Sequence, residues 1–405
     1  MAPKHQTLRP GGTVAVPETY TLMCKNHRVV RFSYTRRTRT ARLLEVCDGS
    51  RWAPPGACGP DGQVDALNLN GWVSMRYVPH TREGLSGLLR EAGCENPADL
   101  MFSSLGLNLS DQYWFLPDGM ELDWHDINYF ENPYVDGRPN GIATDPAHAL
   151  FGPVTSTGGQ VVKWWERRGT QNYLVKGATA YNHEPFAELL ATKLYEFVLE
   201  PGDYVPYGLE WSDGEPRSVC PCFIDASTEL ATMDDLVRRY GDEGDPSRTS
   251  RAAYIELLER QGIRDAQRAV DKMLVCDFLM ANADRHEYNL GAVLDVESRK
   301  ILRVAPIYDN GRGFFYGARR EDQLARGLFE YVSNPFEAEP QRQLEQVEDF
   351  GWLDLGRLAG FADVVEDVLA GNELLPSWFA GAAARQFELR VEQVGRAAEK
   401  SKTSP

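Results

Sequence analysis

The segment that most constrains the fold of this chain runs from Asn282 to Gly291 and reads Asn-Ala-Asp-Arg-His-Glu-Tyr-Asn-Leu-Gly. It follows an almost entirely apolar stretch, 269–281, which predicts a buried helix. Two short apolar runs, 290–296 and 301–304, come next and predict a hairpin. A second polar segment, Ala305 to Gly311, follows directly. A hairpin of this length returns the second polar segment to the side of the first.

Three side chains in these two segments suit phosphoryl transfer. Asp284 lies five residues before Asn289, which is the offset between the Asp and the Asn of a protein-kinase catalytic loop. Asp309 is followed one residue later by Gly311, as in the Asp-x-Gly turn that holds a metal ion. The spacing predicts that Asp284 is the catalytic carboxylate and that Asn289 and Asp309 bind the metal.

The residues upstream of these segments predict a nucleotide clamp. Lys176 comes late in a predicted strand, 171–178, where a lysine that pairs with phosphates is expected. Glu184 and Glu188 lie one helical turn apart in a predicted helix, 184–197. Either glutamate can form the ion pair that orients Lys176, and the spacing leaves both open.

A run of hydroxyls and glycines before that strand predicts a phosphate-binding loop, although a complete G-x-G-x-x-G pattern is missing. The order of loop, lysine, glutamate, Asp, Asn and Asp along the chain is that of a kinase. This shared order makes the prediction stronger than any single match. The loop consists of Thr155, Ser156, Thr157, Gly158 and Gly159.

The two polar segments resemble the HipA-like kinase family, and most closely its CtkA-like branch. The similarity extends to the segments 109–114, 173–177, 184–188 and 218–223. The resemblance implies an α+β, two-lobed protein-kinase-like fold with a β-rich N-terminal part and a mainly helical C-terminal lobe. It also implies an ATP- and Mg²⁺-dependent kinase that phosphorylates Ser or Thr residues of a protein or peptide.

Site residues are carried over from the family only where the motifs match. Asp284 becomes the catalytic base, Asn289 and Asp309 the Mg²⁺ ligands, and Lys176 the phosphate-pairing lysine. Kinases of this family often phosphorylate their own phosphate loop, so Ser156 is the candidate for autophosphorylation. Phosphate there would add almost two negative charges where ATP binds its own phosphates, and we expect inhibition. The adenine-contacting hinge is expected at Cys222, Phe223 and Ile224.

Other acceptors remain open. The order Asp-Arg-His at 284–286 is shared with phosphatidylinositol kinases, which makes a small-molecule, lipid head group or peptide hydroxyl an alternative substrate. A nucleotide-binding regulator without turnover is a further alternative. The segment 311–317, with glycines at its ends and aromatic rings between them, suits either a substrate-contacting loop or core packing.

Composition limits the partners of the chain. A net charge of −16 and a pI near 5.0 argue against general nucleic-acid binding and against attraction to anionic membranes. A basic run, 25–42, is the local exception and predicts a strand pair with a charged face. Seven cysteines, an odd number, and no signal-like apolar run lead us to expect a cytoplasmic location without a disulfide framework.

Stretches rich in glycine, proline and other turn-forming residues divide the sequence into four predicted regions. An aromatic-rich stretch within the second of them, 111–136, is interpreted as an irregular connector. The regions are a flexible arm at 1–18, a β-rich accessory region at 19–150, a kinase N-lobe with phosphate loop, lysine strand and hinge at 151–240, and a helical C-lobe with the catalytic and metal-binding loops at 241–405.

Overall fold

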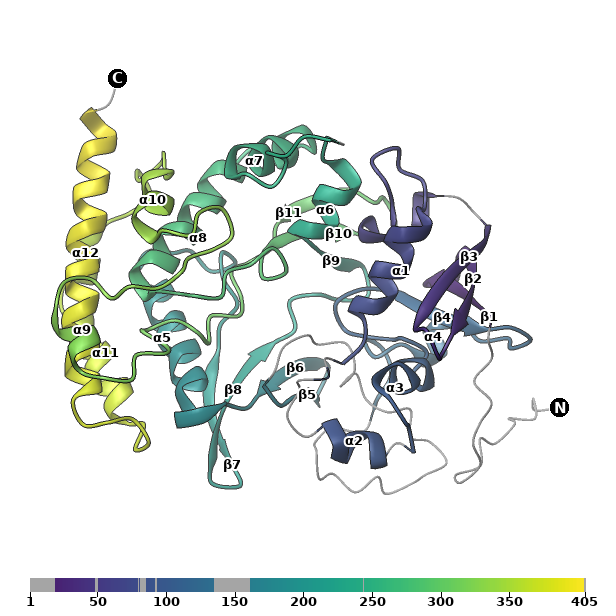
Figure 1. Ribbon diagram of the computed structural model, residues 1–405, viewed down its shortest axis with the longest axis horizontal. Helices are drawn as coiled ribbons and strands as arrows, with labels where there is room; N and C mark the ends of the chain where they lie inside the picture. The colour runs from purple at the N-terminus through teal and green to yellow at the C-terminus, as the bar shows by residue number, and fades with distance from the viewer. Residues whose placement is uncertain are drawn as a thin grey trace. The chain divides into compact units, whose positions relative to one another are not determined.

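The computed structural model describes residues 19–47, 50–78, 80, 85–91, 93–134, 161–242 and 244–403 (Figure 1). The chain divides into two compact units. The first extends to Val175 and also takes in 224–229 and 296–299. The second comprises 176–223, 230–295 and the chain from Lys300 onward. Lys176 therefore belongs to the same unit as the segment 282–291.

An antiparallel sheet with the strand order β3-β2-β1-β4 forms the centre of the first unit. Its core is aromatic: the rings of Tyr20 and Phe102 lie 4.5 Å apart, and those of Phe102 and Phe115 lie 5.3 Å apart. Such offset contacts add to the stabilisation from burial. The elements of this unit are β1 (Thr19–Cys24), β2 (His27–Thr35), β3 (Thr40–Val46), α1 (Ala66–Met75), α2 (Leu85–Glu91), α3 (Pro97–Ser103), β4 (Tyr113–Pro117), α4 (Trp124–Ile127), β5 (Lys163–Arg168) and most of β6 (Gln171–Lys176).

The interpretation of 111–136 as an irregular connector is wrong in part. Tyr113–Pro117 is strand β4, which pairs antiparallel with β1 and completes the sheet. Its sequence, Tyr-Trp-Phe-Leu-Pro, lacks the apolar–polar alternation of a half-exposed strand because four of its five residues are buried. A short apolar run of this kind gives no periodic signal.

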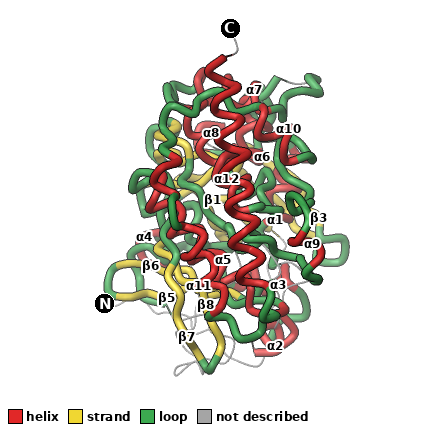
Figure 2. Tube along the Cα trace, turned by 90° about the vertical axis from the view of Figure 1, so that its left-hand side faces the viewer, coloured by secondary structure: helices red, strands yellow, loops and turns green. Residues whose placement is uncertain are grey.

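Helices provide most of the regular secondary structure of the second unit. The predicted helices at 184–197 and 269–281 are confirmed as α5 and α8. Helix α8 is buried along most of its length, and the long C-terminal helix α12 packs on α8 and α11 (Figure 2). The helices are α5 (His183–Val198), α6 (Met233–Tyr240), α7 (Arg251–Arg260), α8 (Ala266–Met280), α9 (Asp322–Ala325), α10 (Pro340–Glu345), α11 (Phe361–Ala370) and α12 (Phe379–Thr403).

The predicted hairpin after the segment 282–291 is also confirmed. Strands β10 (Gly291–Asp295) and β11 (Ile301–Val304) pair antiparallel, and β9 (Thr228–Thr232) extends them in the order β11-β10-β9. A Cβ on Gly291 would come within 2.0 Å of the Ala231 carbonyl oxygen, so only glycine fits here. A second hairpin, β7 (Gly208–Ser212) and β8 (Glu215–Pro221), leads to the predicted hinge.

None of the helices in the described part of the chain combines the length and the apolar character needed to cross a membrane.

The first residue of α5 is a buried histidine whose charge state depends on folding. His183 Nε2 lies 3.0 Å from the Gly313 carbonyl oxygen, which can only accept, so Nε2 carries the proton. Burial is the main cause that lowers the pKa of His183 from 6.5 to about 4, and Arg319 acts in the same direction. The folded chain therefore keeps this ring neutral at pH values where the unfolded chain protonates it.

We expect the free energy of unfolding to fall as the pH falls from 6.5 to 4, because only the unfolded chain takes up a proton on His183 in this window. Above pH 6.5 the ring is neutral in both states and its contribution of about 3 kcal/mol is fully present. Urea unfolding at pH 7 and pH 5 measures the effect. His183→Gln keeps an N–H donor for Gly313 and should lose about 2 kcal/mol less than the unmodified chain between the two pH values. Equal losses would show that His183 does not titrate in this way.

Candidate active site

The segment that carries Asp284 begins where α8 ends. Ala281 adopts a left-handed conformation, with φ of 52°, and terminates the helix. The Asn282 side chain then donates to Asp277 Oδ1 at 2.8 Å and accepts from the Asp284 N–H at 3.2 Å. An Asn side chain that bonds the backbone two residues later is a common way to fix a turn. The loop is therefore held in this turn by hydrogen bonds of its own residues and of α8.

Arg285 fastens this loop to its surroundings. Its guanidinium is completely buried and donates to both carboxylate oxygens of Asp277 at 2.9 and 3.0 Å. One of its terminal nitrogens also donates to the carbonyl oxygens of Asn289 and Tyr308. The other donates to Asn310 Oδ1 at 2.6 Å. A single side chain thus brings the end of the segment 282–291 beside the turn that contains Asp309.

The structure brings the three residues predicted from spacing together. Asn289 Nδ2 donates to the Asp284 carbonyl oxygen at 2.9 Å, which leaves its Oδ1 as the acceptor end of the amide. Asp309 is close enough to raise the pKa of Asp284 through charge repulsion. Asp309 itself has a left-handed backbone, with φ of 58°, which Asp tolerates better than most residues.

The Asp284 carboxylate is 37% exposed and lies near Arg312, whose Nε is 3.6 Å from Asp284 Oδ2. Burial is the largest cause that raises the pKa of the Asp284 carboxyl, and Arg312 opposes it while Asp309 adds to it. A higher pKa makes the carboxylate a better proton acceptor near neutral pH. The carboxylate is also partly open to solvent.

Lys176 is buried and held by two carboxylates. Its Nζ lies 2.9 Å from Glu188 Oε1 and 2.8 Å from Asp309 Oδ1, and it donates to the Tyr207 hydroxyl at 3.3 Å. Burial alone would lower the pKa of Lys176, but Asp309 and Glu188 raise it well above its ordinary value. The ammonium group therefore stays charged, close to the predicted metal ligand Asp309.

Glu188 is the glutamate that pairs with Lys176. Its second oxygen accepts from the Asn310 N–H at 3.0 Å, so it also holds the turn after Asp309. Burial raises the pKa of Glu188, and the adjacent Lys176 opposes that rise. Glu184 instead accepts from the N–H of Thr179 at 3.2 Å and from its hydroxyl. The spacing could not separate the two glutamates because both lie on one face of α5.

The sequence predicts two further groups of residues for this site. The phosphate loop, Thr155 to Gly159, lies outside the described residues. In the predicted hinge, Cys222 and Phe223 belong to the second unit and Ile224 to the first. The Phe223 ring lies 5.6 Å from the ring of Tyr308, next to Asp309. The adenine-binding role of the hinge stays a prediction.

Sequence reasoning missed four residues that build this site. Arg285 and Asn310 lie inside the recognised motifs, where a buried role could have been suspected from their position beside the predicted ligands. Asp277 is polar in an otherwise apolar helix, which is also a signal that could have been read. Tyr207 carries no local signal, and only the fold places its hydroxyl against Lys176 and the Asp309 N–H.

Comparisons with known proteins identify the fold. No protein-family model matches the chain, and no curated protein matches its sequence. A solved chain from the Shewanella oneidensis toxin–antitoxin complex of HipA, HipB and operator DNA matches with a TM-score of 0.52 and 14% identity, over 95% of this chain and 100% of that one. The proinflammatory kinase CtkA of Helicobacter pylori matches with a TM-score of 0.47 and 16% identity, over 60% of this chain and 93% of that one.

The first likeness shows a HipA-like fold, and the predicted α+β class is confirmed. The TM-score of the second likeness, 0.47, is too low to support a fold assignment. At these identities neither likeness assigns an activity to this chain.

Proposed function

We propose that this chain is an ATP- and Mg²⁺-dependent phosphotransferase that acts on a hydroxyl group, and that its acceptor is a Ser or Thr of a protein. The observation that carries the proposal is the position of Lys176, whose Nζ lies within 3 Å of both Glu188 and Asp309. In kinases, a lysine that pairs with the phosphates is oriented by a glutamate of a following helix. Asp284 and Asn289 complete the set within the same unit.

Each residue has a distinct chemical part in this proposal. Asp284 accepts the proton of the attacking hydroxyl, which its raised pKa favours. Lys176 stays protonated and supplies positive charge to the phosphates of ATP. Arg285 keeps the backbone of Asn289 beside that of Tyr308 and so preserves the spacing between the two segments.

Asn289 and Asp309 would hold Mg²⁺. They offer an amide oxygen and a carboxylate oxygen, and Mg²⁺ in nucleotide sites takes one or two carboxylates and completes its shell with phosphates and water. When bound, the ion neutralises charge on the phosphates. Asp309 already contacts Lys176, so the proposed cation would lie beside the proposed phosphate-binding lysine.

Incubation with radiolabelled ATP and Mg²⁺ tests the function. We expect label on the chain itself or on an added protein, and no label after chelation of Mg²⁺ with EDTA. Intact-mass analysis would show whether Ser156 in the predicted phosphate loop is modified. ADP formation only with a metabolite would favour the small-molecule alternative, and nucleotide binding without ADP would indicate a regulator. The absence of both nucleotide binding and ADP formation would contradict the proposal.

The two glutamates of α5 provide a matched pair of variants. Glu188→Gln removes the charge that positions Lys176, and we expect it to lower the transfer rate about 10²-fold, as for other losses of positioning. Glu184→Gln keeps an oxygen for Thr179 and should change the rate less than about 3-fold. Rates of ADP formation at saturating ATP compare the two. Equal effects of both changes would show that the Lys176–Glu188 pair has no special part in transfer.

A further inference from the structure

The segment after Asp309 combines buried rings with exposed charge. Phe314 and Phe315 are fully buried, whereas Arg312 and Tyr316 are partly exposed. The two Phe rings therefore pack in the core of the second unit. The polar side chains beside them stay at the surface.

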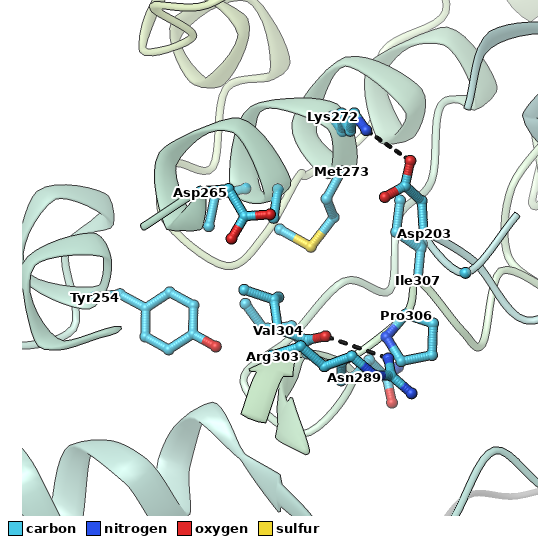
Figure 3. A pocket seen from close by; sticks show the side chains of 15 residues that line it. Asp203, Tyr254, Asp265, Lys272, Met273, Asn289, Arg303, Val304, Pro306 and Ile307 are labelled. Carbon is cyan, nitrogen blue, oxygen red and sulfur yellow. Dashed lines mark hydrogen bonds and ion pairs between the residues drawn. The ribbon is translucent and has the colours of Figure 1, made fainter. Parts of the chain in front are cut away.

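Arg312 and Arg319, which we call the arginine pair, carry positive charge that no hydrogen bond occupies. The lysine of the cavity beside Asn289 already has a partner, because Lys272 Nζ lies 2.6 Å from Asp203 Oδ2 (Figure 3). By contrast, neither member of the arginine pair donates a side-chain hydrogen bond to another residue in the described part of the chain. A guanidinium is always charged and has five N–H donors, so the arginine pair is available to an anionic group.

Arg312 faces the proposed catalytic carboxylate. Its Nε lies 3.6 Å from Asp284 Oδ2, which is close enough for charge attraction but longer than a hydrogen bond. The backbone fixes this position, because the Arg312 carbonyl oxygen accepts from the Ala283 N–H at 3.3 Å. The Arg312 side chain is 38% exposed. An acceptor whose hydroxyl reaches Asp284 therefore also comes within reach of Arg312.

One tyrosine ring joins the two arginines. The guanidinium carbon of Arg312 lies 5.4 Å from the centre of the Tyr316 ring, and that of Arg319 lies 6.0 Å from the same centre. Arg319 also lies 5.3 Å from the centre of the ring of Tyr181, which is exposed. Cation–π contacts of this kind restrain a guanidinium without using its N–H donors. The arginine pair is therefore held beside one ring with its donors open.

Hydrogen bonds hold both rings in place. The Tyr316 hydroxyl lies 3.1 Å from Thr179 Oγ1, and Asn372 Nδ2 donates to the Tyr181 carbonyl oxygen at 2.8 Å. Tyr181 has a left-handed backbone, with φ of 69°, which a tyrosine keeps only where its surroundings enforce it. The Glu184 carboxylate is buried, accepts from Thr179 and forms no ion pair with the arginine pair. The support of the two guanidinium groups is thus part of the folded unit.

We propose that the arginine pair binds an acidic side chain of the protein acceptor, an Asp or Glu close to the residue that receives the phosphate. This inference deepens the function proposed above and rests on it. A guanidinium pairs with a carboxylate through two parallel N–H···O bonds, which neither a neutral nor a basic side chain can form. The exposed arginines therefore select an acceptor by its charge.

The geometry limits where the acidic residue lies in the acceptor. Arg312 is next to Asp284, and Arg319 contacts the same Tyr316 ring as Arg312. An extended chain advances about 3.3–3.6 Å per residue, so a carboxylate that reaches the arginine pair belongs to a residue within about three positions of the acceptor hydroxyl. The preference is for an acidic residue near the acceptor in sequence, not for an acidic protein in general.

Binding of three serine peptides to the full-length chain without nucleotide tests the proposal. The peptides differ only in the residues on both sides of the serine, which are glutamates, glutamines or lysines. Fluorescence polarisation should show the glutamate peptide binding about five-fold more tightly than the glutamine peptide, and the lysine peptide binding most weakly. The preference should weaken at high salt, because the arginine pair is exposed to solvent.

The double variant Arg312→Gln with Arg319→Gln should lose this preference. The chain as a whole has a net charge of −16, so it has no general attraction for an acidic peptide that could replace the arginine pair. Arg320→Gln is the matched control and should keep the preference. Arg320 is also exposed, but its Nε already lies 3.1 Å from Asp322 Oδ1.

Two results would overturn the proposal. One is a glutamate peptide that binds no more tightly than the glutamine peptide, including the case in which neither binds. The other comes from transfer kinetics: the double variant should raise KM for the glutamate peptide about five-fold, and a rise in KM for ATP instead would assign the arginine pair to the nucleotide. Selective binding of the glutamate peptide without any phosphate transfer would contradict only the proposed phosphotransferase, because binding is measured without nucleotide.

Discussion

Replacing Asp284 by Asn is expected to lower the rate of phosphoryl transfer by about 10³-fold or more while the chain stays folded. The change keeps the shape of the side chain but removes its ability to accept a proton. Among the described residues, this carboxylate forms an ion pair with Arg312 at 3.6 Å, a long and partly exposed contact whose loss costs little stability. ADP formation and transfer of labelled phosphate, measured under saturating ATP and Mg²⁺, provide the test.

An ion-paired aspartate outside the site serves as the control. Asp349 Oδ2 lies 2.8 Å from Arg268 Nε, and Asp349→Asn should leave the transfer rate unchanged. Thermal unfolding of both variants shows whether each is folded. A folded Asp284→Asn variant with unaltered activity would remove this residue from the mechanism.

Replacing Arg285 by Met is expected to lower the free energy of unfolding by about 3–5 kcal/mol. The change leaves the Asp277 carboxylate buried without its cation, and it removes the donor shared by Asn289 and Tyr308. Urea unfolding followed by fluorescence measures the loss. Arg260→Met, which breaks an exposed pair with Asp242 at 3.7 Å, is the surface control and should cost less than about 1 kcal/mol.

A double variant separates the buried charge from the rest of the network. Asp277→Leu combined with Arg285→Met removes both charges, and we expect it to recover much of the stability lost in Arg285→Met alone. Recovery should be incomplete because Asp277 also accepts from the Asn282 side chain at 2.8 Å. A double variant less stable than Arg285→Met would show that the unpaired carboxylate is not the main cost.

Local patterns predicted the parts of this protein whose geometry depends on neighbours in the sequence. The apolar run before Asn282 is helix α8, and the two short runs after it are strands β10 and β11. The spacing of Asp284, Asn289 and Asp309 then suffices to bring their segments together, because a tight hairpin has little freedom in where it returns the chain. The sequence determined these elements and the residue types of the site.

Only the tertiary structure decided which partners those residues have. It selected Glu188 as the partner of Lys176, because Glu188 contacts both Lys176 and the Asn310 N–H. Glu184 is instead hydrogen-bonded to Thr179. It placed the buried guanidinium of Arg285 between the segments that contain Asn289 and Tyr308. The tertiary structure also decided strand β4, whose residues are mostly buried and which pairs with the distant strand β1. Ion-pair choice, buried networks and cavities arise from long-range packing, to which the periodicity of a single segment is insensitive.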